Sequence, residues 1–450
     1  MKNKMKIIAL ASLFNFSGAS DAVSISTTNQ GQALILPYYT TENDNESNIK
    51  VINHSDSVKA VRIEFREGFN GQNVLSFNTY LAPHDQFSTT LKPVISTMPG
   101  YTGQDSAAAF TTDDSCTPFL SPQVEFAPWA FTNDVGPENM ARARQGFVQI
   151  VELGTVEGSL ANAANPNDGT PTDCSQLENA FINGGVWEND PNDFIGPAVG
   201  GLSAEMSITN PFEDTVSKYA AIALDGFYEP GGFNHINPGI TADLLANTDT
   251  NKLILNSAFL ENQWNQAFQV VSAAFTQSML SATLGAANET TEYVFTYPTK
   301  YNHVNVASME EPFTQSFGAN GACESIEKYS VDGTGNHIGS SIEQIQMCQS
   351  VNVIGVNTAI PNAPVLVDNY DSVVSDDGTS GVINFDFSDF NSNEGVLASD
   401  PNILYLYTGL PVIGIKMTQT ELNSNVSQSM IPMVGQQDIM QETISASSFE

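Results

Sequence analysis

Residues 58–85 read VKAVRIEFREGFNGQNVLSFNTYLAPHD, and apolar and polar side chains alternate along much of this segment. A period of two is typical of a β-strand with one buried face, here made by Val61, Ile63 and Phe65. The opposite face is expected to meet water and carries three charged residues: Arg62, Glu64 and Arg66. Asn-Gly at 70–71 permits the positive φ of a tight connection, so the segment predicts two strands around a turn.

Short apolar or alternating runs recur along the rest of the chain, as in QALILPYYT, SNIKVIN, QGFVQIVELGTVEGSL, VGGLSAEMSITN and EYVFTYPTK. Short strands separated by polar turns are typical of antiparallel sandwiches. We therefore expect a mainly β fold, with an immunoglobulin-like β-sandwich at 23–100. A larger β-rich region, residues 101–417, is expected to elaborate it.

One helical insertion is expected within that region, at about residues 241–287. Apolar residues recur there at steps of three and four, which favours a helix packed on the sandwich; they are Leu260, Trp264, Ala267, Phe268, Val271, Phe275 and Met279. Residues 418–450 are rich in Ser, Gln and Met and show no clear period, so we expect a loosely ordered tail.

The N-terminus has the three parts of a signal peptide, expected to span residues 1–22. MKNKMK is basic, IIALASLFNF is apolar, and SGASDA offers small residues at a cleavage point after Ala22, with Ala19 as an alternative. No later segment reaches the roughly 18 apolar residues that a membrane-spanning helix needs. The mature protein is expected in the periplasm, on the outer cell surface or in the medium.

The four cysteines fit this destination, because an even number in an exported chain indicates disulfides. Proximity in sequence favours the pairs Cys116–Cys174 and Cys323–Cys348. The spacing does not resemble the paired Cys-x-x-Cys of a zinc site.

A formal net charge of −35 restricts the partners of the chain. Non-specific nucleic-acid binding depends on neutralising phosphates with Lys and Arg, so it is excluded. Adhesion to anionic lipid is disfavoured for the same reason. The acidity is consistent with solubility in extracellular surroundings.

Motifs that carry catalysis are missing from the sequence. The five histidines form no HExxH motif and no His-x-His pair, and no phosphate-binding glycine loop is present. Ser203 lies in GLSAE, where a hydrolase nucleophile motif would need a glycine at Glu205. Glycoside hydrolysis needs only two carboxylates, and the 50 acidic residues single out no pair. The sequence therefore assigns no catalytic or cofactor-binding residue.

Calcium is the one cofactor for which candidate ligands appear. The segment DNYDSVVSDDGTSG carries acidic residues near glycines, as oxygen-rich calcium loops do; the candidates are Asp368, Asp371, Asp376 and Asp377. The spacing does not match an EF-hand, and such loops are common on acidic proteins.

Several blocks resemble a family of uncharacterised exported proteins of Gram-negative bacteria. They are GQALILPYYT, VINHSDSVKAVRIEFREGFNGQNVLSFNTYLAPHDQF, ARARQGFVQIVELGTVEGSL, VGGLSAEMSITN and YVFTYPTK. The likeness covers most of residues 31–300, with Ala82 where that family usually has serine. It implies export, and it brings no activity and no catalytic residues.

These observations favour a non-enzymatic exported protein, either an adhesin-like binder of a protein or glycan surface or a subunit of a surface assembly. The polar loops near Cys116–Cys174 and Cys323–Cys348 are the expected binding regions, because function on such scaffolds usually lies in loops. Two alternatives stay open: a secreted hydrolase with dispersed carboxylates and a calcium-stabilised structural module.

Overall fold

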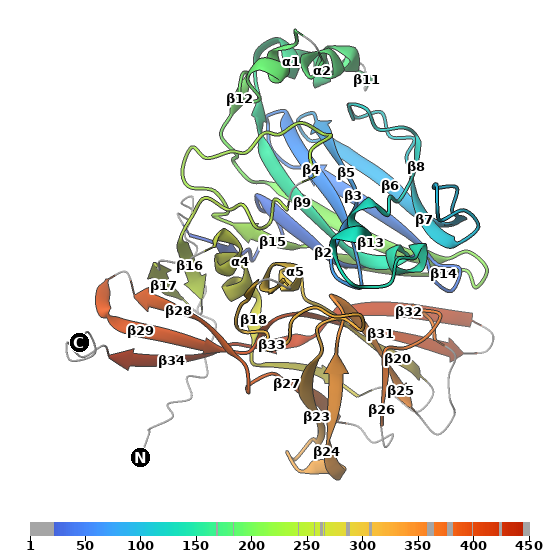
Figure 1. Ribbon diagram of the computed structural model, residues 1–450, viewed down its shortest axis with the longest axis vertical. Coiled ribbons are helices and arrows are strands. Elements are labelled where there is room, and N and C mark those ends of the chain that lie inside the picture. Colours follow the sequence, from blue (N-terminus) through green and yellow to red (C-terminus); the bar gives the residue numbers. More distant parts are fainter. Residues whose placement is uncertain are drawn as a thin grey trace.

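The computed structural model of the protein describes residues 22–443 with short gaps. The gaps are residues 168–169, 183, 242, 256, 262–263, 265, 285–288, 306–307, 358–363, 376–380, 398 and 423–424. The described chain is mainly β, as predicted, and its strands form two lobes (Figure 1).

The N-terminal sandwich consists of two largely antiparallel sheets. The first has the order β1 (Ser24–Ile25), β15 (Ile222–Asp225), β2 (Ala33–Thr40), β9 (Gln145–Val156), β4 (Lys59–Glu67) and β5 (Asn73–Leu81), with β12 (Ile195–Gly196) at the end of β9. The second has the order β14 (Thr215–Ala220), β13 (Leu202–Asn210), β3 (Glu46–Asn53), β6 (Gln86–Ile95), β7 (Asp105–Phe110) and β8 (Gln123–Glu125). The sandwich therefore extends from the expected residues 23–100 to residues 24–225.

The C-terminal lobe contains three five-stranded sheets (Figure 1). One is β16 (Lys252–Leu255), β17 (Ala258–Glu261), β28 (Asn391–Leu397), β29 (Asp400–Thr408) and β34 (Asp438–Thr443). Another is β24 (His337–Met347), β23 (Glu324–Asp332), β27 (Gly381–Asp386), β19 (Met279–Thr283) and β33 (Val434–Gln436). The last is β26 (Ser372–Ser375), β25 (Val351–Asn357), β20 (Glu289–Thr296), β31 (Ile413–Leu422) and β32 (Asn425–Pro432).

Helices and short strand pairs connect these sheets. The helices are α1 (Gly158–Ala164), α2 (Cys174–Ala180), α3 (Val186–Asn189), α4 (Ala267–Phe275) and α5 (Lys300–His303), with 3-10 turns at Trp129–Asn133 and Met140–Ala143. The strand pairs are β10 (Pro166–Asn167) with β11 (Thr170–Pro171), β18 (Thr276–Gln277) with β30 (Leu410–Pro411), and β21 (Val304–Asn305) with β22 (Ser308–Met309). Among the described residues, no helix combines the length and the apolar character needed to cross a membrane.

Two expectations from the sequence are corrected here. Within the described part of 241–287, α4 is the only helix. β16 pairs with β17, and β17 and β19 pair with β28 and β27 from later in the chain. Leu260 and Met279, counted as helix positions, lie in β17 and β19. The expected loose tail forms β32, β33 and β34 in its described part, paired with β31, β19 and β29.

The alternation in β4 correctly predicts the apolar core. Val61, Ile63 and Phe65 are fully buried between the two sheets of the sandwich, where the Phe65 ring stacks on Phe77 at 6.3 Å. Phe77 in turn meets Phe87 of the opposite sheet at 5.5 Å. Burial of these side chains contributes about 2 kcal/mol each.

The other face of β4 is not exposed, contrary to expectation. Arg62, Glu64 and Arg66 are buried, because residues 236–241 and Asp243 cover this side of the sheet. Arg62 donates hydrogen bonds to the carbonyls of Pro238 and Ile240, and Arg62 and Arg66 both pair with Glu64 at 3.3 Å. Arg66 also lies 3.3 Å from Asp243. Buried charges of this kind need partners on every side.

A second buried ion pair lies at the start of β4. Lys59 Nζ and Glu152 Oε1 are 2.5 Å apart and both side chains are inaccessible to solvent. Glu152 also accepts backbone N–H groups of Val199 at 3.0 Å and Gly200 at 2.8 Å. The pair therefore connects β4, β9 and the loop before β13.

Two hydrophobic clusters contain residues of both lobes, and residues 364–371, which we call the strap, link the lobes further. Core residues of the sandwich, such as Leu36, pack in the same cluster as Val353 and Ile415 of the C-terminal lobe. The Leu366 carbonyl accepts a hydrogen bond from Thr40 Oγ1 at 2.8 Å, which attaches the strap to β2.

Glu292 of β20 attaches the strap to the C-terminal lobe. Its carboxylate is fully buried and accepts hydrogen bonds from the N–H groups of Val365 (2.6 Å) and Leu366 (3.0 Å) and from Tyr370 Oη (2.7 Å). Burial raises the pKa of Glu292 to about 7, even though these donors favour the ionised form.

Replacing Glu152 with Gln is expected to destabilise the sandwich by about 3–5 kcal/mol, because Lys59 would keep its charge in the interior without a counter-ion. Urea unfolding measures the change. Glu205→Gln is the matched control, since Glu205 pairs with Lys218 at 3.4 Å on the solvent-exposed surface; it is expected to cost less than about 1 kcal/mol. Equal losses of unfolding free energy in the two variants would show that the Lys59–Glu152 ion pair does not stabilise the sandwich more than a surface pair does.

The raised pKa of Glu292 predicts that the free energy of unfolding depends on pH. A carboxyl whose folded pKa is raised above 4.5 to about 7 binds its proton more tightly in the folded protein. Its stabilising contribution is therefore complete below pH 4.5 and is lost as the pH rises through about 7. Relative to Glu292→Gln, the free energy of unfolding of the wild type should fall by about 3 kcal/mol between pH 4 and pH 8. A difference that stays constant with pH would refute this.

Candidate functional site

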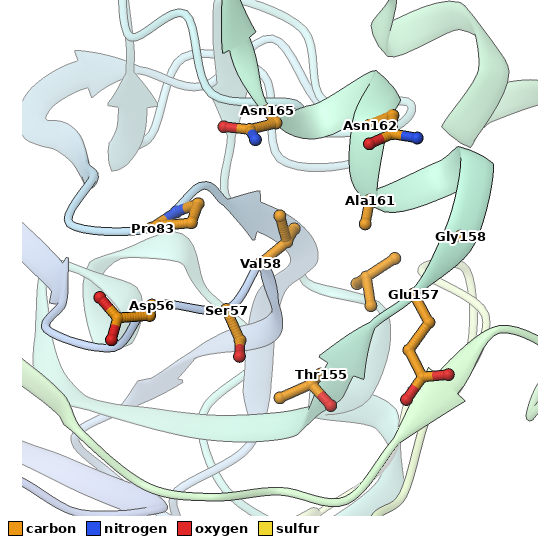
Figure 2. A pocket seen from close by; sticks show the side chains of 11 residues that line it. Asp56, Ser57, Val58, Pro83, Thr155, Glu157, Gly158, Ala161, Asn162 and Asn165 are labelled. Carbon is orange, nitrogen blue, oxygen red and sulfur yellow. The ribbon is translucent and has the colours of Figure 1, made fainter.

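A pocket with a volume of about 530 Å³ is lined in part by α1, which lies at the end of the N-terminal sandwich away from the C-terminal lobe (Figure 1). Figure 2 shows the side chains that line it. It is formed by the turn between β3 and β4, the turn between β5 and β6, the end of β9, and α1. Its lining consists of Asp56, Ser57, Val58, Pro83, Thr155, Val156, Glu157, Gly158, Ala161, Asn162 and Asn165.

Helix α1 contributes one of its faces to the pocket. Gly158, Ala161, Asn162 and Asn165 recur at steps of three and four, so they share a side of the helix. In Figure 2, Asn162 and Asn165 project from this helix above the pocket, while Asp56 and Glu157 lie on opposite sides of it. The helix begins where β9 ends, because the Glu157 N–H donates to the Phe194 carbonyl at 2.9 Å instead of continuing the ladder with β4.

The disulfide Cys116–Cys174 ties this end of the sandwich together. Cys174 begins α2, which packs against α1, and the Asp173 N–H donates to the Ala163 carbonyl at 3.0 Å. The Cys116 carbonyl accepts the N–H of Tyr80 in β5 at 2.8 Å. The helices that border the pocket are therefore fastened to the sheet. The second disulfide, Cys323–Cys348, connects the segments flanking β23 and β24, and both bonds join the pairs expected from proximity in sequence.

The polar groups of the lining are amides, hydroxyls and carboxylates. Two amides, two hydroxyls and two carboxylates face or border the pocket, and the lining contains no Lys or Arg. His84 beside Pro83 bonds Asp56 Oδ1 at 2.9 Å, and both side chains are exposed. Such a surface offers hydrogen bonds to hydroxyl-rich ligands and repels anions.

The calcium candidates do not come together at a described metal site. Asp368 lies in the strap, pairs with Arg144 at 2.5 Å and accepts the N–H of Asn43. Asp371 accepts hydrogen bonds from Gln349 Nε2 and the Val353 N–H. Asp376 and Asp377 lie outside the described residues. Within the described ranges, no group of three or more His, Cys, Asp or Glu side chains is arranged to hold a metal ion.

Ser203 and His54 form a contact that the sequence did not indicate. Ser203 Oγ lies 2.7 Å from His54 Nε2 on the exposed end of β13 and β3. A serine nucleophile also needs a group that orients the histidine. No carboxylate in the described part of the chain is hydrogen-bonded to His54, and Ser203 sits in a regular ladder rather than on a strained turn.

Three basic groups with lowered pKa values are buried and do not line the pocket. Burial lowers the pKa of His235 to about 4, where Tyr80 Oη bonds its Nε2 at 2.8 Å. The same cause lowers the pKa of His303 to about 4 and that of Lys300 to about 7. Lys300 Nζ donates to the carbonyls of Met347 and Gln349. The three groups are therefore buried and hydrogen-bonded within the fold.

Comparisons of the chain with protein-family models, with curated proteins and with solved structures found no match. The turns that supply Asp56, Pro83 and Glu157 carry no motif, so sequence reasoning missed them; it did point to the region between Cys116 and Cys174, where α1 lies.

Proposed function

We propose that the protein is an exported, non-enzymatic binding protein that holds an uncharged glycan of a surface or matrix in this pocket. The observation that carries the proposal is the lining: amides and hydroxyls beside two carboxylates, with no cationic side chain. A sugar presents hydroxyls that both donate and accept hydrogen bonds, which this lining matches. An anionic ligand would face both the local carboxylates and a net charge of −35.

The exposure of the two carboxylates favours binding over hydrolysis. A glycoside hydrolase keeps one carboxyl protonated at neutral pH by burying it or by placing it against another negative charge. Asp56 and Glu157 are both exposed, and the pocket is open rather than a deep cleft. The hydrolase alternative is therefore the less supported one.

The contacts of Val23 are compatible with cleavage after Ala22. Val23 is fully buried, its N–H donates to the Lys252 carbonyl at 2.9 Å, and its carbonyl accepts the N–H of Ile254 at 2.8 Å. A chain that starts at Val23 after cleavage would keep these contacts. The two disulfides suit an oxidising compartment. The immunoglobulin-like character of the sandwich and the resemblance to exported Gram-negative proteins are part of the same proposal.

Cleavage is tested by expressing the complete chain in a Gram-negative host and determining the mature N-terminus by mass spectrometry. We expect Val23 as the first residue, four oxidised cysteines, and recovery outside the cytoplasm. Protease treatment of intact cells separates a periplasmic from a surface location. A product that keeps MKNKMK and four free thiols would refute export.

Glycan binding is tested with the mature protein on immobilised cellohexaose, maltohexaose, mannohexaose and chitohexaose, with a hexamer of galacturonate as the anionic comparison. Asn162→Ala is expected to weaken binding of the preferred neutral hexamer about 10-fold, the loss of roughly one hydrogen bond. Ser159→Ala is the matched control, because Ser159 is exposed on the same helix outside the pocket lining.

Three results would count against this proposal. Binding of none of the neutral hexamers would refute glycan recognition, and equal effects of the two α1 variants would remove the pocket as its site. Release of shorter saccharides from the bound hexamer would show that the protein is a hydrolase rather than a binding protein.

A further inference from the structure

Phe194 combines exposure with an unfavourable backbone conformation. Its φ is 59°, in the left-handed region that glycine and asparagine occupy easily and bulky residues avoid. The side chain is 45% exposed, so burial of the ring recovers only part of this cost. A strained residue persists where its surroundings hold it in place, and such residues cluster at ligand sites.

The backbone on both sides of Phe194 is fixed by hydrogen bonds. Its carbonyl accepts the N–H of Glu157, and Trp187 Nε1 donates to the Asp193 carbonyl at 2.8 Å. Immediately after it, Ile195 of β12 pairs with Val156 at the end of β9. The ring therefore projects from a rigid support rather than from a free loop.

The ring lies beside Gly158, a residue of the pocket lining, although Phe194 itself is not part of that lining. A Cβ atom at Gly158 would be 2.8 Å from Cδ1 of Phe194, so the absence of a side chain there allows the ring its position. Gly158 and its neighbour Glu157 both line the pocket. A partly exposed aromatic ring thus lies next to a residue of a lining that carries amides, hydroxyls and carboxylates.

We propose that Phe194 is a stacking platform for the C–H face of a neutral pyranose whose hydroxyls bind in the pocket beside it. This inference rests on the proposed function and specifies its ligand. A flat aromatic face contacts the apolar side of a sugar, while polar groups at the ring's edge fix its orientation. The ligand class is therefore an uncharged pyranose with an unsubstituted face, and uronates are rejected by Asp56 and Glu157.

Two other exposed phenylalanines provide comparisons within the same chain. Phe212 is 81% exposed in the turn between β13 and β14 and does not line the pocket. Phe119 is 55% exposed with φ 65°, and its ring packs on Phe181 at 6.4 Å. Phe212 controls for loss of an exposed ring, and Phe119 controls for loss of a ring from a left-handed backbone position.

The test uses the mature full-length protein and the same immobilised neutral hexamers. Phe194→Ala is expected to weaken binding of the preferred hexamer at least 10-fold, whereas Phe194→Tyr, which keeps the ring, should stay within about 3-fold of the wild type. Phe212→Ala and Phe119→Ala should leave affinity unchanged. Phe194→Gly relieves the backbone strain, so it should lose the same affinity while keeping the melting temperature of the wild type.

The outcomes separate this inference from the proposed function. If Asn162→Ala weakens binding and Phe194→Ala stays within 2-fold of the wild type, the platform is overturned and the glycan pocket stands. If no neutral hexamer binds the wild type, the pocket function fails and the platform fails with it. A large drop in melting temperature for Phe194→Gly would show a purely structural ring and overturn the platform.

Discussion

Burial of both faces of β4 is the constraint on which the rest of the structure depends. One face supplies Val61, Ile63 and Phe65 to the core, and the other carries Arg62, Glu64 and Arg66 into a second interior. Guanidinium and carboxylate groups are tolerated there only because each one is paired or hydrogen-bonded. Residues 236–241, which supply carbonyls, and Asp243 are consequently as necessary to the sandwich as the strands themselves.

The same arrangement positions the pocket. The ion pair between Lys59 and Glu152 joins the start of β4 to β9. Glu152 also binds the backbone of the loop that leads into β13. The lining residues Val58, Thr155 and Glu157 are close in sequence to Lys59 or Glu152. The Cys116–Cys174 disulfide attaches the neighbouring helices to the sheet. A binding surface built on such a support requires little ordering of the protein when a ligand arrives.

Local patterns predicted the β class, the core face of β4 and the cysteine pairs, because these depend on neighbours in sequence. They misjudged Arg62, Glu64 and Arg66, since an alternating charged face looks solvent-exposed until a cover from more than 170 residues away is known. Leu260 and Met279 fit a helical stripe, yet pairing with β28 and β27 places them in strands. Sequence reasoning pointed to the region between Cys116 and Cys174, where α1 lies, but it did not find the pocket, because the lining residues come from two turns, the end of β9 and α1 and form no motif.

The strap has a consequence for how the protein acquires its structure. The chain leaves a ribosome or a translocation channel from its N-terminus, but β2 is held by β15 and by residues 364–371, far behind it. The strands of the sandwich can pair once residues 24–225 have emerged, but the contact of β2 with the strap and the core shared with the C-terminal lobe must wait for most of the polypeptide. Contacts between distant parts of the chain slow folding and leave hydrophobic surface exposed until they form. A chaperone would protect the chain from aggregation most effectively before the strap has docked.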